Sequence, residues 1–284
     1  MKTFGFIGLG LMGGSLAKAV GRFSRTERIL ACDANEEVLN KALAEKVIDK
    51  AFTPSGADAM LAACDIVFIC LYPKAAADFL LRHENAFKSG AVVTDISGVK
   101  KEAAKRFSGF TRTDIFFVSG HPMAGSEKEG YEHSSADICL ERNYILIENA
   151  ATDASSIALL SDIIRAMGFK RIICTDEETH DRKIAFTSQL CHVIASALVD
   201  SAEDSSITAF GGGSYEDLTR IAMINAPLWT QLFFENRENL LAHIGRFEQS
   251  LENIRALLKS GKTDELCTLL ETVRKKRIAM STLK

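Results

Sequence analysis

A glycine-rich turn near the start of the sequence could bind the phosphates of a dinucleotide. Gly8 permits a tight turn, Gly10 lets the backbone approach a pyrophosphate, and Gly13 lets a helix pack closely on a strand. The amino end of that helix would then face the phosphates. The full turn is Gly8, Leu9, Gly10, Leu11, Met12 and Gly13. Its specificity depends on context, because such a turn must follow a strand and open a helix to bind a dinucleotide.

An acidic residue farther along indicates which dinucleotide to expect. Asp33 stands twenty positions after Gly13, where a carboxylate can accept hydrogen bonds from the ribose hydroxyls of adenosine. The same carboxylate would repel a 2′-phosphate, so the sequence favours NAD over NADP. Arg22, Arg25 or Arg28 could offset that repulsion, which leaves NADP as the alternative.

Two polar stretches, residues 95–100 and 121–127, follow predicted strands in the middle of the chain. Ligands of open α/β sheets bind at the carboxyl ends of the strands, so polar groups there are candidates for function. His121 begins the second stretch. It could be an ordinary surface histidine, but its place on the cofactor edge of the sheet favours a catalytic role.

The second half of the chain carries a third set of polar candidates. Ser188 and His192 are four residues apart and therefore share one face of a predicted helix. His192 could equally be a core histidine whose hydrogen bonds a neighbour satisfies. Arg220 follows a Gly211-Gly212-Gly213 break. It could clamp a carboxylate with two parallel hydrogen bonds, or it could form an ordinary salt bridge.

Short apolar runs alternate with amphipathic helical patterns through the first half of the chain. The predicted strands are residues 3–7, 28–32, 66–71, 91–94, 115–119, 144–147 and 170–174. The predicted helices are residues 14–22, 36–45, 75–87, 100–107 and 155–167. This alternation predicts βαβ units and a parallel sheet, an α/β fold of the Rossmann type.

The pattern becomes entirely helical after residue 175. Predicted helices cover residues 177–203, a short segment around 215–224, a long segment from Pro227, and a last segment after Thr263. Apolar residues recur at three- and four-residue spacing along the long segment, so it needs a hydrophobic partner. We therefore expect residues 1–175 to form a Rossmann-type domain. Residues 176–284 would form an all-helical substrate and dimerisation domain that joins two subunits as a homodimer.

Composition excludes several classes of protein. The 284 residues carry a formal net charge of −3 without a basic stripe, so we expect no nucleic-acid partner. No run reaches the roughly 18 apolar residues of a membrane helix, and from the first residues we expect no signal peptide. The seven cysteines are an odd number without CxxC spacing, so we expect no disulfide framework, no metal site and a cytoplasmic location.

Taken together, these segments resemble the prephenate dehydrogenase family, which includes the arogenate dehydrogenases of tyrosine biosynthesis. The resemblance spans almost the whole chain, and it rests on the order and spacing of its motifs. They are residues 8–14 with Ser15, residues 95–100, residues 121–127, His180-Asp181, residues 188–192, and residues 220–229. The family implies a Rossmann domain, a helical dimerisation domain, and an active site in the cleft between them.

The family reaction is an NAD-dependent oxidative decarboxylation that turns a cyclohexadienol into an aromatic ring. The resemblance implies that His121 binds the ring hydroxyl and accepts its proton, which suits a side chain with an ordinary pKa of about 6.5. It implies that Arg220 binds a substrate carboxylate and that His192 and Ser188 line the substrate pocket. Ser126 and Glu127 would belong to a loop that binds substrate and gates access.

Two positions depart from the family pattern. The loop after Asp95 usually carries its catalytic hydroxyl three positions on, but this chain has Gly98 there and a serine at Ser97. Ser97 is therefore the candidate for that role. Some members have a lysine four residues before the arginine, where this chain has Glu216. A carboxylate there could repel prephenate or pair with the amine of arogenate, so arogenate remains open, although we favour prephenate.

Two other classes of protein remain as alternatives. The β-hydroxyacid dehydrogenases share a Rossmann domain followed by helices, but they expect a catalytic lysine early in the helical half. Lys183 is the candidate there, and its sequence setting does not match. A nucleotide-sensing protein without turnover is the second alternative, and the base and the carboxylate clamp both argue against it.

Overall fold

The computed structural model describes residues 1–23, 27–107, 111–149 and 152–282. By internal contacts the chain divides into two compact units, Met1–Asn236 and Arg237–Lys284. Among the described residues, none of the helices combines the length and apolar character that crossing a membrane would demand.

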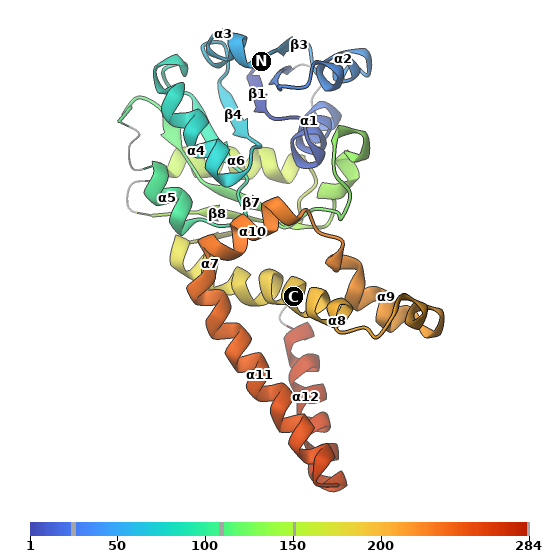
Figure 1. Ribbon diagram of the computed structural model, residues 1–284. Helices are drawn as coiled ribbons and strands as arrows, with labels where there is room; N and C mark the ends of the chain where they lie inside the picture. Colours follow the sequence, from blue (N-terminus) through green and yellow to red (C-terminus); the bar gives the residue numbers. More distant parts are fainter. Residues whose placement is uncertain (24–26, 108–110, 150–151, 283–284) are drawn as a thin grey trace. The chain divides into compact units, whose positions relative to one another are not determined.

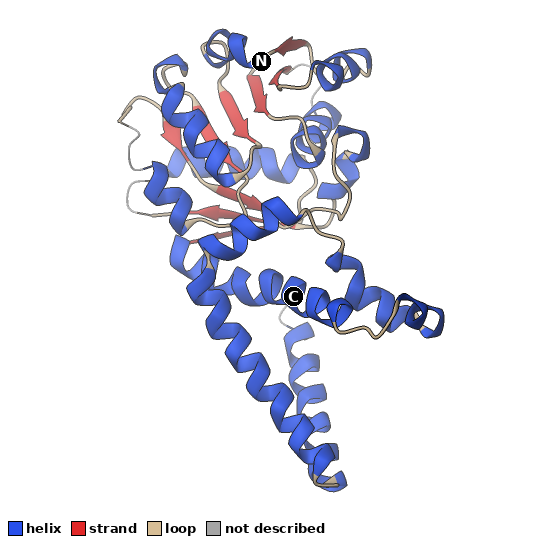
Figure 2. Ribbon diagram, in the orientation of Figure 1, coloured by secondary structure: helices blue, strands red, loops and turns tan. Residues whose placement is uncertain are grey.

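A six-stranded parallel sheet forms the centre of the first unit, in the order β3-β2-β1-β4-β5-β6 (Figures 1 and 2). Its strands are β1 (Thr3–Ile7), β2 (Arg28–Cys32), β3 (Lys50–Phe52), β4 (Ile66–Ile69), β5 (Val92–Asp95) and β6 (Phe116–Phe117). The chain leaves β1 toward β2 on one side and later returns to β4 on the other. The predicted parallel sheet is confirmed, and it has a switch point between β1 and β4.

Apolar side chains on both faces of this sheet explain why it is buried. Successive residues of a strand point to opposite faces, so Phe6 and Phe68 stack in one core cluster while Ile7 and Ile69 belong to the other. Helices cover both faces. They are α1 (Leu11–Phe23), α2 (Glu36–Ala44), α3 (Ala57–Leu61), α4 (Pro73–Arg82), α5 (Lys101–Phe107) and α6 (Ala154–Ala166).

A second sheet of three strands departs from the single parallel sheet that the alternation predicts. It consists of β7 (Gly120–Pro122), β8 (Asn143–Ile147) and β9 (Arg171–Thr175). β7 pairs antiparallel with β8, and His121 lies opposite Ile145. The predicted strand at residues 115–119 shrinks to two residues, because the chain leaves the first sheet and begins β7. His121 therefore lies on a strand rather than in the expected loop.

The helical part of the first unit is more broken than its apolar pattern predicts. The expected helix at residues 177–203 becomes α7 (Glu177–Ile184), a π-helical stretch (Ala185–Gln189) and α8 (Leu190–Asp200). α9 (Gly213–Thr219), a 3-10 turn (Arg220–Ala222) and α10 (Ala226–Glu235) follow. Asn225 caps α10 by accepting a hydrogen bond from the backbone N of Leu228, as an N-cap residue does.

The second unit is a pair of helices, α11 (Arg237–Lys259) and α12 (Thr263–Thr282), joined by a turn at Gly261. Gly261 has a φ of 65°, the left-handed conformation that commonly ends a helix. The long segment predicted from Pro227 is thus two helices, α10 and α11. They divide at Asn236, which leaves the helical conformation at the end of α10.

Candidate active site

The glycine turn joins β1 to α1 at the switch point of the parallel sheet, where open α/β sheets bind their ligands. Gly8 has a φ of 90°, and a Cβ on Gly13 would lie 2.0 Å from the carbonyl oxygen of Gly8. Both positions therefore require glycine. Among the described residues, no atom lies within 4 Å of where a Cβ of Gly10 would be, so the turn is open to a ligand at that point.

Asp33 follows β2 and lies beside this turn. Its Oδ2 accepts a hydrogen bond from the backbone N of Leu9 at 2.6 Å, and its Oδ1 accepts one from the backbone N of Asn35 at 2.8 Å. The half-buried carboxylate thus holds the turn in place. A carboxylate has about four acceptor sites, so Asp33 keeps lone pairs for ribose hydroxyls.

The arginines that could favour NADP do not gather around Asp33. Arg22 is at the end of α1, where it forms an ion pair with Asp137 at 2.8 Å. Arg28 begins β2, whereas Asp33 follows its last residue, so the length of the strand separates them. Arg25 lies outside the described residues. Neither Arg22 nor Arg28 is therefore placed to offset the charge of the Asp33 carboxylate.

A buried ion pair between Asp95 and Lys100 shapes the loop after β5. The Nζ of Lys100 lies 3.0 Å from Oδ2 of Asp95, and both side chains have 0% exposure. Asp95 also accepts hydrogen bonds from the hydroxyl of Ser119 and the backbone N of Ser97, while Lys100 donates to the carbonyl of Gly120. Burial raises the pKa of Asp95, but the ammonium of Lys100 and the hydrogen bonds from Ser119, Lys100 and Ser97 together outweigh burial and hold that pKa below its usual value.

His121 is half-buried and begins a row of three hydrogen-bonded side chains whose other two members are buried. Its Nδ1 lies 2.9 Å from Nε2 of His180, and Nδ1 of His180 lies 2.7 Å from Oδ1 of Asp181. Burial lowers the pKa of His121 well below 6.5, and the neighbouring His180 and Lys100 lower it further. His121 is therefore a neutral imidazole at neutral pH, as a general base must be. The sequence marks His180-Asp181 as a motif but gives no sign of this contact.

Ser97 and Gly98 lie on the loop that faces His121. The hydroxyl of Ser97 is buried and has no hydrogen-bond partner within the described part of the chain. A Cβ on Gly98 would lie 3.9 Å from Nε2 of His121 and 3.4 Å from a methyl of Leu232. A side chain at position 98 would therefore approach the imidazole of His121. The catalytic role expected for the buried hydroxyl of Ser97 stays a prediction.

Arg220 and Glu127 come together from segments far apart in the sequence. Nη1 of Arg220 lies 2.8 Å from Oε2 of Glu127, and about half of the arginine side chain is exposed. A hydrogen bond from its own backbone N–H lowers the pKa of Glu127, and the contact with Arg220 lowers that pKa further. Ser126 is exposed, and its hydroxyl accepts a hydrogen bond from the backbone N of Lys128 at 3.1 Å. The structure thus joins Arg220 to the loop predicted to bind substrate.

Ser188 and His192 share a helix face, as their spacing predicts. Nδ1 of His192 lies 3.0 Å from the carbonyl oxygen of Ser188. The imidazole stacks on the ring of Trp229, with 3.6 Å between the ring centroids. Burial lowers the pKa of His192. Trp229, the ring that His192 contacts, lies in α10 at helical spacing. The sequence alone does not distinguish such an aromatic residue from one that only fills the core.

Comparisons with known proteins give the family. The model of the nucleotide-binding domain of prephenate dehydrogenase matches residues 16–190, and that of the prephenate dehydrogenase dimerization domain matches residues 176–272. The chain belongs to the prephenate dehydrogenase family. This membership confirms the resemblance that the motifs carry, and it favours that family over the β-hydroxyacid dehydrogenases.

Relatives of this prephenate dehydrogenase family member match along nearly all of it. Cyclohexadienyl dehydrogenase of Zymomonas mobilis is 30% identical, over 99% of this chain and 97% of its own. Prephenate dehydrogenase of Lactococcus lactis is also 30% identical, over 99% of this chain and 78% of its own. The crystal structure of prephenate dehydrogenase from A. aeolicus with hydroxyphenyl propionate and NAD+ has a TM-score of 0.88 and 29% identity, covering 99% of this chain and 98% of its own.

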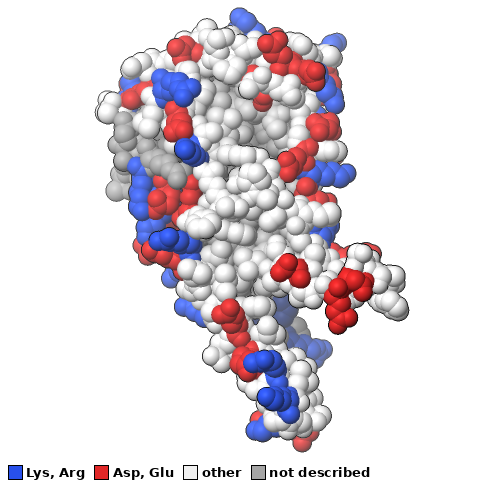
Figure 3. Space-filling model, in the orientation of Figure 1, with Lys and Arg blue, Asp and Glu red and all other residues white. Residues whose placement is uncertain are grey.

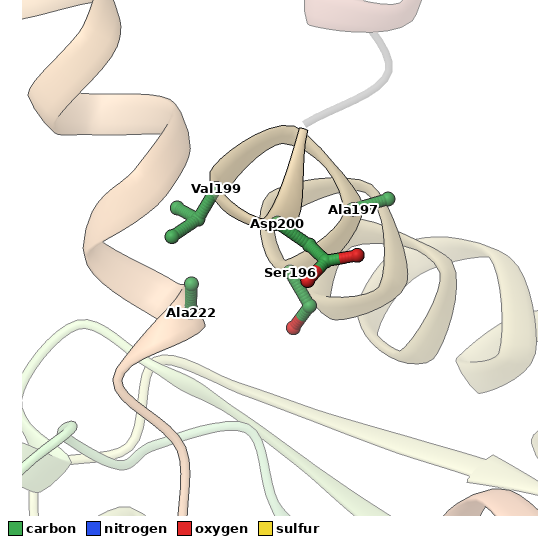
Figure 4. Close-up of a pocket in the computed structure, with 5 residues that line it drawn as sticks. All are labelled: Ser196, Ala197, Val199, Asp200 and Ala222. Atoms are coloured by element: carbon green, nitrogen blue, oxygen red, sulfur yellow. The ribbon is translucent and has the colours of Figure 1, made fainter. Parts of the chain in front are cut away.

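A pocket lies between α8 and the 3-10 turn that carries Arg220 (Figure 4). Its lining residues are Ser196, Ala197, Val199, Asp200 and Ala222. Within the described ranges, His, Cys, Asp and Glu side chains form no group of three that could hold a metal ion. On the face drawn in Figure 3, Lys and Arg are interspersed with Asp and Glu.

Proposed function

We propose that this protein catalyses the NAD-dependent oxidative decarboxylation of prephenate to 4-hydroxyphenylpyruvate. The observation that carries the proposal is the half-buried His121, whose pKa lies well below its ordinary value, on the edge strand of the second sheet next to the loop that follows β5. The protein's membership of the prephenate dehydrogenase family supplies the class of reaction. Turnover with prephenate and NAD, followed by NADH absorbance, tests the proposal directly.

The glycine turn and Asp33 are the proposed NAD site. NAD, when bound, accepts the hydride of the reaction. The residues present fit it: the open position at Gly10, the amino end of α1 behind it, and the half-buried carboxylate of Asp33 beside it. Leu9, Leu11 and Met12 complete the proposed contact. The relative from A. aeolicus, which was crystallised with NAD+, supports NAD as the cofactor.

Replacing Gly13 by alanine is expected to abolish NAD binding. The added Cβ would lie 2.0 Å from a backbone oxygen of the turn, so the turn must open and the start of α1 must shift. Calorimetric titration with NAD measures the loss. Gly21→Ala is a matched control, because Gly21 lies on the same helix and its Cβ would meet its nearest neighbour at an ordinary 3.7 Å. Unaltered NAD affinity in Gly13→Ala would contradict the proposed site.

His121 is the proposed general base, and its role follows from its free nitrogen. Nδ1 is committed to His180, which leaves Nε2 to hydrogen bond to the ring hydroxyl of prephenate and accept its proton. Loss of that proton makes the hydroxyl carbon a carbonyl as hydride leaves, and carbon dioxide then departs as the ring becomes aromatic. Ser97 is the proposed hydroxyl partner in this step.

Arg220 is the proposed ligand of a substrate carboxylate. Its guanidinium already binds the carboxylate of Glu127, so prephenate can exchange one carboxylate partner for another. Ser126, Glu127, Ser188 and His192 are the proposed neighbours of the substrate.

Arg220→Gln is expected to raise the KM for prephenate about 10- to 100-fold, the equivalent of one charged hydrogen bond lost. Steady-state kinetics with prephenate as the varied substrate measures the change. Arg165→Gln is the control, because Arg165 also pairs with a surface carboxylate, but on α6. Equal KM values in the Arg220 variant and the wild type would remove Arg220 from the substrate site.

Prephenate is the proposed substrate rather than arogenate, although Glu216 bears on the choice. Glu216 is exposed on α9, one helical turn before Arg220. A carboxylate there would attract the amine of arogenate and repel an anionic substrate. A matched assay of prephenate and arogenate, each with NAD and with NADP, decides both substrate and cofactor.

We also propose that two copies of the chain associate through the helical segment of residues 176–284, in the cytoplasm. In the second unit, Leu241, Leu251 and Leu258 are each more than half exposed along α11, and exposed apolar patches of this kind mark association surfaces. The match to a dimerization domain supports the dimer. All seven cysteines are free thiols, which favours a reducing compartment. Sedimentation equilibrium tests the dimer.

A further inference from the structure

Two buried residues lie behind His121, on the side away from its free nitrogen. We propose that His180 and Asp181 are positioning residues that fix the tautomer of His121 and take up the charge formed when it accepts a proton. This inference rests on the proposed function of His121 as base. It extends that function from His121 alone to a row of three hydrogen-bonded side chains, those of His121, His180 and Asp181.

The chain of contacts is continuous and shielded from water. His180 joins Nδ1 of His121 to Oδ1 of Asp181 through its two ring nitrogens, at 2.9 Å and 2.7 Å. The side chains of His180 and Asp181 have 0% and 2% exposure. A buried imidazole that bridges two fixed partners has no freedom to rotate its ring, so each nitrogen must either donate or accept in a defined direction.

Asp181 sets that direction because its carboxylate only accepts. The backbone N of Lys100 donates to its Oδ1 at 2.9 Å, and the backbone N of Lys101 donates to its Oδ2 at 2.8 Å. These donors come from the amino end of α5, where unpaired N–H groups favour a carboxylate. Nδ1 of His180 is then the donor in the remaining contact with Asp181.

The tautomers of both histidines follow from this donor. A neutral imidazole carries one N–H, so Nε2 of His180 accepts and Nδ1 of His121 must donate to it. His121 is thereby protonated at Nδ1, and its Nε2 carries a free lone pair. Burial lowers the pKa of His121 and of His180, which supports the neutral form of both rings.

The same row of three side chains can carry positive charge away from the substrate. As Nε2 of His121 gains the proton of the substrate hydroxyl, its Nδ1–H can pass to Nε2 of His180, so one N–H bond breaks as another forms. The resulting imidazolium donates from both nitrogens and lies next to the carboxylate of Asp181. Within the part of the protein that the structure describes, the other charges that act on His121 and His180 are the paired ammonium of Lys100 and carboxylate of Asp95, which largely offset each other.

Long-range ¹H–¹⁵N NMR of protein labelled at histidine tests the tautomer without any substrate. The chain has six histidines, and the His121→Asn variant assigns the His121 signals by their disappearance. Wild-type protein is expected to show His121 protonated at Nδ1 and bare at Nε2. Wild-type His121 protonated at Nε2 would overturn the inference, and this measurement needs no variant to fold.

Variants of His180 add a kinetic measurement. His180→Leu is expected to mix the His121 tautomers and lower kcat about 10- to 100-fold with little change in KM, since only the base is altered. His180→Gln offers a carbonyl oxygen to Nδ1 of His121, so it should restore the tautomer and part of kcat. An unchanged kcat or an unchanged tautomer in His180→Leu would overturn the proposal.

His83→Gln is the matched control, because His83 is also paired with a carboxylate, that of Asp58. It lies at the carboxyl end of α4, and its partner Asp58 lies on α3, so its replacement should leave both readouts unchanged. If prephenate were not the substrate, the NMR result would still stand. If the tautomer were wrong while prephenate turned over, only the present inference would fail.

Discussion

Replacing His121 by asparagine is expected to lower kcat with prephenate about 100-fold or more, the usual range for loss of a general base. Asparagine can keep a hydrogen bond to Nε2 of His180 through its amide, so β7 should retain its pairing with β8. What it cannot do is accept a proton. KM should change much less than kcat, because the substrate carboxylate would still meet Arg220.

The pH dependence distinguishes a lost base from a damaged fold. Burial places the pKa of His121 well below 6.5, so the neutral base persists into mildly acidic solution. In the wild type, kcat/KM should rise with pH as His121 loses its proton and reach its plateau below pH 6.5. The His121→Asn variant should lack that rise while binding NAD normally. A variant with wild-type kcat, or with the same acidic limb, would remove His121 from the reaction.

The sequence predicts the sheet well because its strands are buried on both faces. Residues 3–7 and 28–32 are continuous apolar runs, and β1 and β2 have the same bounds. β3 has no such run, since Lys50–Phe52 is a short edge strand, partly exposed. The sequence fails to predict β7 for a different reason. It is only three residues long and contains proline and glycine, so its strand conformation comes from pairing with β8.

The helical half shows where periodicity fails to locate breaks. Apolar spacing continues through Ala185–Gln189, but the chain there widens into a π-helical stretch. Gln189 donates a hydrogen bond to the carbonyl of Leu232 and accepts one from Asn236. These contacts between α10 and the π-helical stretch join positions more than forty residues apart. Periodicity within one segment carries no information about them.

The candidate site likewise contains contacts within one local segment and contacts between segments far apart in the sequence. The contact between the glycine turn and Asp33 could be predicted from sequence, because one βαβ unit sets their spacing. The contact of His121 with His180 spans 59 positions and depends on how β7 meets α7. The hydroxyl of Ser97 makes it the candidate from sequence, and the structure shows in addition that a Cβ at position 98 would lie 3.9 Å from Nε2 of His121. Residue type alone carries no information about that distance.

The loop that holds these neighbours depends on the ion pair of Asp95 and Lys100. Lys100 ties the end of β5 to the start of β7, since its ammonium binds Asp95 and the carbonyl of Gly120, next to His121. Its backbone N also binds Asp181. One lysine thus connects the end of β5, the residue before His121 and the carboxylate of Asp181, so the geometry of the proposed site depends on it.

Lys100→Met is therefore expected to lower the free energy of unfolding by about 3 to 5 kcal/mol, the usual cost of removing one partner of a buried ion pair. Methionine fills the volume but leaves the carboxylate of Asp95 buried without its cation and the carbonyl of Gly120 without its donor. Urea denaturation measures the loss. The double variant Asp95→Asn with Lys100→Met should recover much of it, because neither charge of this ion pair is then left buried without its partner. If the single and double variants were equally unstable, shape and not charge would account for the role of Lys100.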